Sequence, residues 1–391
     1  MPDESNIMTA RILSSLSDVS ANDWDRCAGS VNPFVSYAFL SALEDSGSAT
    51  ADTGWMPQHI VIEDPIGTVL AAAPLYLKNH SYGEYVFDWG WADAFERAGG
   101  HYYPKLQCTV PFTPATGPRF LIRNSVNKTQ STDLYQTLAG TMIQVAKKMK
   151  VSSLHITFPE YVEWEIAGNY GFLQRVGQQF HWENRNYTDF EAFLGALTSR
   201  KRKQIRKERQ RIADTGLKFT ALRGKEIKDE HWHAFYAFYL NTTEKKWGPS
   251  YLTEEFFQLL GDRLGDSVLL IIAENDYQPV AGALNLIGEN TLFGRNWGCN
   301  TNYKFLHFET CYYRAIDFAI DHGLKRIEAG AQGHHKIQRG YLPNTTYSAH
   351  WIADPNLRQA VSHFISKERE AMKDEMSILA NHSPYRDETA D

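Results

Sequence analysis

Cysteine is scarce in this sequence, and its spacing excludes two common structural devices. The four cysteines among the 391 residues are Cys27, Cys108, Cys299 and Cys311. No C-x-x-C pair is present, which argues against a zinc ribbon and against the disulfide framework of a small secreted protein. We therefore expect reduced thiols, as in a cytoplasmic protein.

Long apolar runs are also missing. No stretch reaches the roughly 18 consecutive apolar residues that indicate a membrane-spanning helix. The segment Met1–Ala10 contains Asp3 and Glu4, and it lacks the basic and apolar regions of an export signal. These absences predict a cytoplasmic protein with no membrane span.

A net positive charge is the third absence, because the formal charge is -6. Proteins that coat nucleic acid need a positive field over much of their surface, so any anion-binding site here must be local. The composition, with 43% hydrophobic and 22% charged residues, is that of a packed protein. A chain of this length is expected to form two domains.

The hydrophobic pattern repeats in the two halves of the chain. Each half has two strands joined by a turn, then an amphipathic helix, then a strand. In the first half the strands are 59–63, 68–77 and 154–158 and the helix is 133–148; in the second half the strands are 268–274, 280–287 and 326–329 and the helix is 308–322. The repeat predicts an internal duplication of mixed α/β lobes over 1–185 and 186–391. A last helix is predicted over 357–376.

The most unusual segment is TSRKRKQIRKERQRI, which predicts a basic helix over 199–213 with Ser199 as its N-cap. Its cations are Arg200, Lys201, Arg202, Lys203, Arg206, Lys207, Arg209 and Arg211. Cations in the first turn of a helix oppose the helix dipole, and a local rule broken in this way often marks function. The segment is either a site for phosphates or a solvated helix face.

A second segment, residues 80–120, mixes charged residues with aromatic rings and fits neither a helical nor a strand period. Its candidate ligand-binding residues are Glu84, Asp88, Trp91 and Lys105. Such a stretch is typical of a cleft that holds a polar ligand between rings. The alternative is a loop that satisfies its polar groups by its own contacts.

The third segment, EAGAQGHHKIQRGY, leaves a predicted strand and carries His334, His335, Lys336 and Arg339. A histidine can act as a general base on an amine near neutral pH, and the two cations can hold a phosphate or a carboxylate. Adjacent histidines on an extended chain point to opposite faces, so we expect no metal site here.

Just upstream, FGRNWGCNTNYKFLHFETCYY runs from a strand into the helix that carries Glu309. Arg295, Trp297 and His307 are expected near the same strand end, with Arg295 and Trp297 as further binding candidates. Glu309 is a second candidate for the base. Its alternative role is that of a buried carboxylate bonded to nearby amides.

These segments together resemble the FemAB-like family of acyltransferases within the GNAT superfamily. The resemblance rests on NPFVSYAFLSALEDSGS, HSYGEYVFDWGWADAFERAGGHYYPKLQ, VPFTPATGPR, SRKRKQIRKER, LHFETCYYRAIDFAIDHGL and EAGAQGHHKIQRGYLPNTTYSAHWI, which span most of residues 32–355. It implies two tandem GNAT-like lobes with mixed sheets. It also implies transfer of an acyl or aminoacyl group to an amine acceptor, with a peptidoglycan precursor among the acceptors it allows.

The donor stays open between acyl-CoA and aminoacyl-tRNA, and no covalently bound cofactor is expected. The Q/R-x-x-G-x-G/A loop with which acetyltransferases hold coenzyme A is missing, and RNWGCN at Arg295 is the nearest string. We expect the two lobes to hold donor and acceptor across a cleft, with His335, His334 or Glu309 as the base. The rival hypothesis is a non-catalytic module of the same shape that binds a nucleotide, RNA or a wall precursor.

Overall fold

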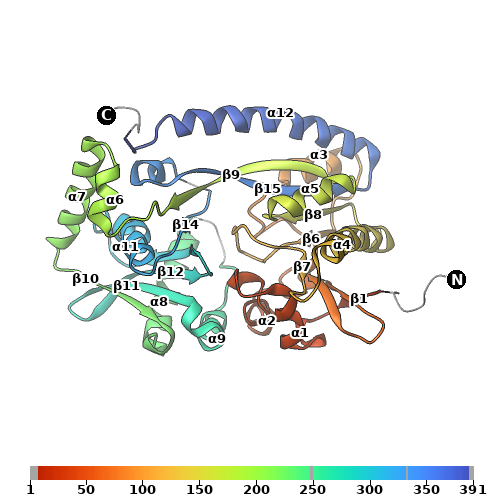
Figure 1. Cartoon of the computed structure of the whole chain (residues 1–391), viewed down its shortest axis with the longest axis horizontal. Coiled ribbons are helices and arrows are strands. Elements are labelled where there is room, and N and C mark those ends of the chain that lie inside the picture. Colours follow the sequence, from red (N-terminus) through yellow and green to blue (C-terminus); the bar gives the residue numbers. More distant parts are fainter. Residues whose placement is uncertain (1–7, 247–249, 332, 387–391) are drawn as a thin grey trace. The chain divides into compact units, whose positions relative to one another are not determined.

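The computed structural model describes residues 8–246, 250–331 and 333–386 (Figure 1). The chain forms two compact units. Unit 1 comprises Met1–Gly177 and Thr345–Met372, and unit 2 comprises Gln178–Asn344 and Lys373–Asp391. The chain therefore passes between the units three times. The predicted lobe boundary after residue 185 stays a prediction, since packing units need not coincide with duplicated lobes.

Unit 1 contains a four-stranded sheet in the order β1-β3-β4-β7. Its strands are β1 (Thr9–Leu13), β3 (His59–Glu63), β4 (Val69–Ala73) and β7 (Leu121–Ile122). β3 and β4 pair antiparallel, which confirms the first predicted hairpin. The predicted range of the second strand of that hairpin, 68–77, was too long. The strand ends before Pro74, where the chain leaves this sheet, because proline cannot donate to a strand ladder.

The other strands of unit 1 follow the order β15-β8-β6-β5-β2. They are β2 (Trp55–Pro57), β5 (Leu75–Lys78), β6 (Lys105–Cys108), β8 (Ser153–Thr157) and β15 (Leu342–Ile352), of which residues 345–352 belong to this unit. β8 pairs parallel to β6 and antiparallel to β15. The first unit thus obtains one of its strands from the far end of the chain.

The helices of unit 1 pack against these strands. They are η2 (Leu16–Asp18), α1 (Ala21–Ala28), η3 (Pro33–Val35), α2 (Tyr37–Asp45), α3 (Trp89–Arg97), α4 (Lys128–Met149), α5 (Tyr161–Asn169) and residues 355–372 of α12 (Pro355–Ala380). α4 buries Leu134, Leu138 and Met142 at the spacing of one helix face, in a core shared with β3, β4 and β8. The amphipathic pattern that predicted this helix is therefore the pattern that buries it.

Unit 2 is built on the strands β10-β11-β12-β13-β14-β9. They are β9 (Leu173–Glu183), of which residues 178–183 belong to this unit, β10 (Lys218–Arg223), β11 (Val268–Asn275), β12 (Gln278–Ile287), β13 (Thr291–Cys299) and β14 (Arg326–Glu328). β11 and β12 form the second predicted hairpin. β13 pairs parallel to β14 only over Thr291–Phe293, and then continues to Cys299 paired with β12 but not with β14.

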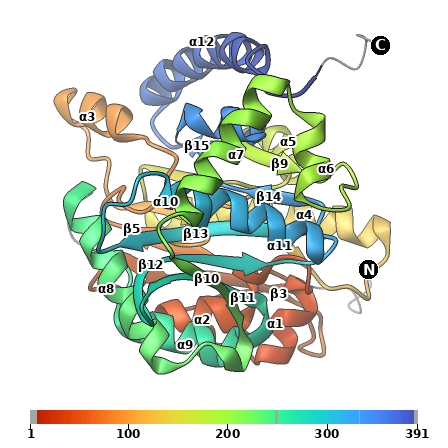
Figure 2. The same ribbon diagram turned by 90° about the vertical axis from the view of Figure 1, so that its left-hand side faces the viewer.

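Helices cover both faces of these strands. They are α6 (Phe190–Ala196), α7 (Ser199–Ala213), η4 (Gly224–Glu226), α8 (Asp229–Lys246), α9 (Glu254–Leu264), η5 (Gly265–Ser267), α10 (Leu306–Phe308), η6 (Glu309–Tyr313), α11 (Arg314–Asp321), η7 (His334–Arg339) and α12 (Pro355–Ala380), of which residues 373–380 belong to unit 2. Leu269 and Ile271 share a core with α11, whereas Ile272 and Gly282 lie against Phe235 of α8. This alternation follows from the two-residue period of a strand (Figure 2).

The predicted basic helix is confirmed with its bounds, Ser199–Ala213, but its cap differs. Thr198, not Ser199, is the N-cap residue, and its side chain makes no capping hydrogen bond. The prediction of Ser199 as the cap was wrong, because Ser199 is itself the first residue of the helix. The predicted C-terminal helix is confirmed and extends over Pro355–Ala380. No helix of the described residues is both long and apolar enough to cross a membrane.

Candidate active site

The helix that follows β13 contains a wide turn. α10 passes into the π-helical segment η6 over Glu309–Tyr313 before α11 begins. A π turn rotates its side chains relative to an α-helix, and such turns frequently occur at functional sites. Here it directs Glu309, Tyr312 and Tyr313 toward three different partners. All three side chains are buried.

Tyr313 contacts the basic helix through the single acidic residue of that segment. Its hydroxyl donates a hydrogen bond to Glu208 of α7. The same carboxylate accepts two bonds from Nη2 of Arg339, at 3.0 and 2.8 Å. Arg339 also lies over the ring of Phe308, 3.4 Å from its centroid. Glu208 and Arg339 are both buried, so this ion pair joins α7 to η7 from within the core of unit 2.

Tyr312 contacts the predicted base. Its hydroxyl lies 3.1 Å from Nε2 of His335, whose side chain is exposed on one side and packs against Phe308 and His307. Nη1 of Arg339 donates to the main-chain oxygen of His335 at 2.8 Å. The imidazole is therefore held at both its ring and its backbone.

Gly333 makes this position of the imidazole possible. Its φ is +99°, and a Cβ built on it would lie 2.5 Å from the His335 ring. The glycine thus lets the imidazole lie against the main chain. The side chain of His334, the neighbouring candidate, lies outside the described residues, and its role stays a prediction.

Glu309 is enclosed by arginines. Its Oε1 forms ion pairs with Nη2 of Arg209 at 3.1 Å and with Nε of Arg314 at 2.9 Å, and Arg209 also bonds to Asp317 at 2.7 Å. Burial raises the pKa of Glu309, and the two guanidinium groups oppose that shift. Both arginines contact the same oxygen, and the side chain is buried, so the carboxylate is fixed between α7 and the helix that carries it. The geometry therefore favours the role of a buried structural carboxylate for Glu309, with arginine side chains as its partners in place of the expected amides.

Lys336 lies one residue beyond His335 but turns inward. Its ammonium donates to the main-chain oxygens of Ala329 and Gly330, at the end of β14. Burial lowers the pKa of Lys336 to about 8. The cation is thus placed beside the point where β13 continues without β14.

Arg295 and Trp297 both lie on β13, and the ring centroid of Trp297 is 5.2 Å from that of His307. The string around Arg295 is therefore a strand and not a loop that opens a helix. Trp297, His307, Tyr312 and His335 form one continuous group of ring contacts in unit 2.

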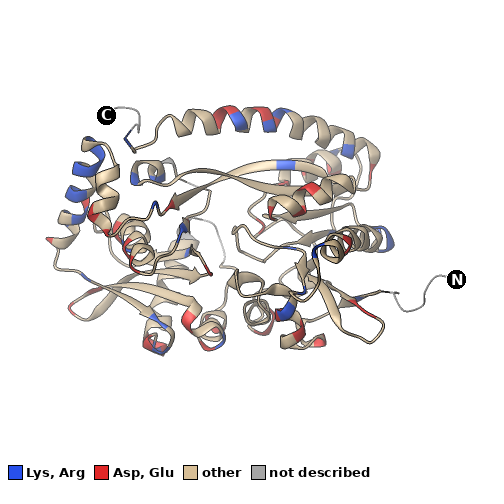
Figure 3. Ribbon diagram, viewed as in Figure 1, with Lys and Arg blue, Asp and Glu red and all other residues tan. Residues whose placement is uncertain are grey.

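The outer face of α7 is strongly cationic (Figure 3). Among the described residues, no acid forms an ion pair with Arg200, Lys201, Lys203 or Lys207. Arg206 pairs with Glu191 at the surface, and Arg202 bonds to the hydroxyl of Ser199 at 3.3 Å. Arg211 has no acid partner either, but its guanidinium lies over the ring of Phe305. In the part of the chain that the structure describes, the four cations without any of these contacts are the unpaired group and the candidate anion site; they are Arg200, Lys201, Lys203 and Lys207.

The candidates of the aromatic segment converge inside unit 1. The ammonium of Lys105 lies 2.7 Å from Glu84 and 2.5 Å from Asp88, and all three are buried. Trp91 packs against His350, with ring centroids 4.9 Å apart. The charged candidates thus bind one another, which is the alternative that the sequence left open for this segment.

Several residues of these networks were missed from the sequence. In unit 2 they are Glu208, Tyr312 and Tyr313. In unit 1 they are Lys78, whose ammonium lies 3.8 Å from Glu84, and His155 and His350, whose Nδ1 atoms lie 2.8 Å apart. Glu208 could have been found, because it lies three residues after Ile205 and four before Ile212 on the buried stripe of α7. Tyr312, Tyr313, His155 and His350 meet partners far away in sequence, so no local pattern marks them. Lys78 bonds to nearby residues, but no period marks the irregular segment that supplies them.

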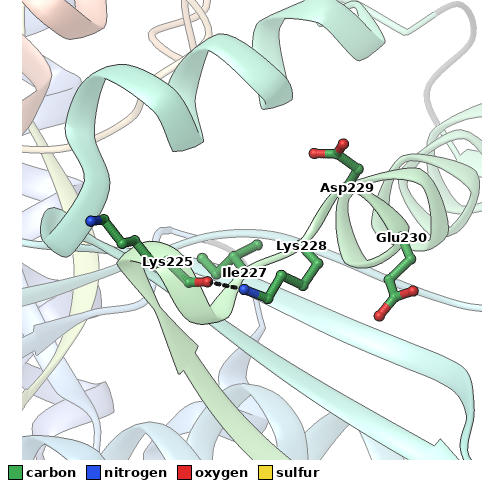
Figure 4. Close-up of a pocket in the computed structure, with 5 residues that line it drawn as sticks. All are labelled: Lys225, Ile227, Lys228, Asp229 and Glu230. Atoms are coloured by element: carbon green, nitrogen blue, oxygen red, sulfur yellow. Dashed lines mark hydrogen bonds between the residues drawn. The ribbon is translucent and has the colours of Figure 1, made fainter.

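Other features are less suited to chemistry. A surface hollow lined by Lys225, Ile227, Lys228, Asp229 and Glu230 shares no residue with the networks above (Figure 4). In it, the ammonium of Lys228 donates to the main-chain oxygen of Lys225 at 2.7 Å. Among the described residues, no three His, Cys, Asp or Glu side chains gather as metal ligands do.

Known structures share this fold at low sequence identity. FemX is 11% identical with a TM-score of 0.55, covering 88% of this chain and 98% of its own. The C-terminal domain of a candidate lysylphosphatidylglycerol synthetase from Agrobacterium fabrum is 9% identical, with a TM-score of 0.54 and coverage of 89% and 96%. L-PGS from Bacillus licheniformis is 10% identical, with a TM-score of 0.51 and coverage of 86% and 98%.

These similarities confirm the predicted fold class, a mixed α/β fold. No curated protein sequence matches the chain. The FemAB-like family, described as peptidoglycan biosynthesis/recognition, matches residues 15–387. The predicted enzyme class, acyl or aminoacyl transfer, follows from that match. The chain belongs to the FemAB-like family.

Proposed function

We propose that this protein transfers an aminoacyl group from aminoacyl-tRNA to an amine of a cell-wall precursor. The observation that carries the proposal is the buried Glu208–Arg339 pair, which joins the cationic helix α7 to the turn that holds His335. The candidate phosphate-binding surface and the candidate base are thus joined by one buried ion pair in unit 2. Both parts are needed for transfer from a phosphate-bearing carrier.

The shape of α7 favours RNA over coenzyme A as the carrier. The helix has 15 residues and is therefore about 22 Å long. Its unpaired cations, Arg200, Lys201, Lys203 and Lys207, lie within its first nine residues, which suits successive phosphates of a nucleic-acid backbone. Coenzyme A is usually held by main-chain amides at the start of a helix, and the nearest string to that loop lies here in β13.

The reaction that we propose forms an N–C bond and breaks an ester C–O bond. The acceptor amine attacks the ester carbonyl, His335 takes the proton that the amine loses, and the ribose hydroxyl of the tRNA leaves with a proton. This requires the tautomer of His335 in which Nε2–H points at the oxygen of Tyr312 and Nδ1 accepts the proton. The Lys336 ammonium is our candidate to stabilise the oxyanion, and desolvation strengthens that interaction.

Binding can be tested by filter retention of bulk tRNA and by thermal shift with acyl-CoA and with UDP-linked wall precursors. We expect tRNA to bind and the triple variant Arg200→Ala/Lys203→Ala/Lys207→Ala to bind it at least about tenfold more weakly. The matched control, Lys225→Ala/Lys228→Ala, removes lysines of the Figure 4 hollow and should bind as the native chain does. If acyl-CoA stabilises the protein and tRNA does not bind, the carrier is coenzyme A and not tRNA.

Catalysis can be tested separately from binding. His335→Gln should bind tRNA normally and lower kcat by about 100-fold or more, because a positioned base typically contributes that much. Tight tRNA binding with no transfer to any amine, in the native chain as well as in His335→Gln, would instead identify a non-catalytic RNA-binding module.

A further inference from the structure

The loop before α3 exposes an unusual number of aromatic rings. Tyr82, Tyr85, Phe87 and Trp89 are 56, 42, 52 and 49% exposed, although they lie within eight residues of one another. The ring centroid of Trp89 is 5.9 Å from that of Tyr82 and 5.2 Å from that of Phe87. Tyr82, Phe87 and Trp89 therefore form a continuous group of exposed rings, and we call the segment that carries them the aromatic loop (residues 82–89).

The polar residues between the rings point in the opposite direction. The Lys105 ammonium donates to Ser81, Glu84 and Asp88 at 2.8, 2.7 and 2.5 Å. Asp88 also accepts from the Tyr102 hydroxyl at 2.7 Å. Burying an ammonium and two carboxylates costs free energy that close pairing only partly returns, whereas apolar residues would fill the same space at lower cost. The network fixes the inner face of the loop in one conformation.

The main chain of the loop is fixed as well. The carbonyl oxygen of Tyr82 accepts from Lys78 at 3.0 Å, and that of Phe87 accepts from Arg175 at 2.9 Å. Gly83 has a φ of +80°, and a Cβ there would lie 2.6 Å from the ring of Phe112. The exposed rings are thus held outward by a rigid base, and they cannot fold back without breaking these contacts.

A rigid exposed aromatic surface indicates a partner, because soluble proteins seldom leave large apolar patches uncovered. Trp and Tyr, each an apolar ring with a polar edge, are enriched at the boundary between lipid and water. Figure 2 shows α3, which continues from the aromatic loop, standing out from the strands of unit 1. A projecting surface suits a flat bilayer better than it suits a small ligand, which needs a hollow.

The charges around the aromatic loop specify the kind of bilayer surface. On α3, Asp93 and Arg97 pair with each other at 2.7 Å, and Glu96 is exposed. Lys78 and Lys105 are buried, so they offer no charge to a membrane. We propose that the aromatic loop inserts its rings into the headgroup region of a bilayer, without requiring anionic lipid. This inference goes beyond the transfer reaction and does not depend on it.

Vesicle sedimentation tests the proposal, with the full chain and vesicles of phosphatidylcholine alone. Zwitterionic lipid at high salt removes any contribution from α7, whose attraction to anions is screened. We expect the native chain to bind and the variant Tyr82→Ser/Phe87→Ser/Trp89→Ser to bind at least about tenfold more weakly. All three side chains are about half exposed, so the variant should retain the native melting temperature.

The matched control is Tyr161→Ser/Tyr170→Ser/Tyr277→Ser, which removes three other exposed rings and should bind like the native chain. Lipids with brominated tails should also quench the native tryptophan emission more than that of Trp89→Tyr. Failure of the native chain to bind phosphatidylcholine, or equal binding by both triple variants, would overturn the proposal. Two other outcomes would also overturn it, if the loop variant alone lost the interaction. Binding to insoluble glycan in place of vesicles would identify a saccharide-binding surface, and self-association would identify a dimer interface.

Discussion

Two ion pairs of α7 differ in how much water reaches them. The Glu208 and Arg339 side chains are each 5% exposed and lie 2.8 Å apart, whereas Glu191 and Arg206 are 64 and 52% exposed. Water screens the exposed pair, while loss of one partner from the buried pair leaves an uncompensated charge. We therefore expect the buried Glu208–Arg339 pair to stabilise the fold and the exposed Glu191–Arg206 pair to contribute little stability.

We predict that Glu208→Ala lowers the free energy of unfolding by about 3 to 5 kcal/mol, because Arg339 is left charged and buried. The control Glu191→Ala should change it by no more than about 0.5 kcal/mol. Urea denaturation of both variants measures the difference. Equal effects of the two substitutions would show that the inner pair is not the link between α7 and η7.

A second residue-scale prediction concerns pH. Burial lowers the pKa of His155 to about 3 from an ordinary 6.5, and its Nδ1 lies 2.8 Å from Nδ1 of His350. Below pH 6.5 the unfolded chain gains a proton that the folded chain does not, so stability present above pH 6.5 is lost as the pH falls toward 3.

His155→Gln should lose about 1 to 3 kcal/mol at pH 7 through its broken hydrogen bonds. Its stability should nevertheless fall less steeply than that of the native chain between pH 6.5 and 4. Denaturation curves at a series of pH values test both effects. Parallel pH profiles for the two proteins would exclude His155 as a source of acid sensitivity.

Among the elements, α7 has its cations in the wrong place for stability. Arg200, Lys201 and Arg202 occupy the end where the helix dipole is positive, and the N-cap Thr198 makes no side-chain bond there. An arrangement that weakens the helix suggests that these cations are kept for another purpose.

We therefore predict that Arg200→Glu raises the free energy of unfolding by about 0.5 kcal/mol while it weakens tRNA binding. Arg211→Glu is the matched control, because Arg211 is in the last turn, where a cation is favourable. Arg211→Glu makes the same change in charge as Arg200→Glu, but it should lower the free energy of unfolding. Melting temperatures and filter binding give both readouts, and a stability change of the same sign in both variants would contradict the argument.

The elements also show how far the sequence could be interpreted. Both hairpins, the basic helix and α12 were predicted, because each is marked by a local period or a local charge pattern. The end of the strand at Pro74 was missed, although proline itself marks it. The turn holding His335 and the cations of α7 were recognised separately, but the Glu208–Arg339 bond between them joins residues 131 positions apart. No periodicity carries that information.

For the whole molecule, the net charge of -6 limits where a polyanion can bind. If the four unpaired cations of α7 are the main contacts, the logarithm of the tRNA association constant should fall with the logarithm of salt concentration with a slope of about -3 to -4. Filter binding at several salt concentrations gives this slope. A much steeper slope would mean that further surfaces of the protein contact the RNA.

A fragment tests whether the first half of the chain is self-sufficient. Residues 1–185 lack Thr345–Met372, which belong to unit 1 and supply the antiparallel partner of β8. We predict that this fragment shows no cooperative melting by circular dichroism, and that the same fragment joined by a flexible linker to 345–372 does. Cooperative melting of residues 1–185 alone would support the predicted lobe boundary as a folding boundary.

The return of Thr345–Met372 to unit 1 has a consequence for biosynthesis. Proteins with consecutive domains can fold the first while the ribosome is still making the second. Here the ribosome must have released nearly the whole polypeptide from its exit tunnel before unit 1 has all its strands. Unit 1, although most of it is translated first, therefore stays incomplete until residues 345–352 have emerged, and until then the open edge of β8 is a surface for chaperones to shield.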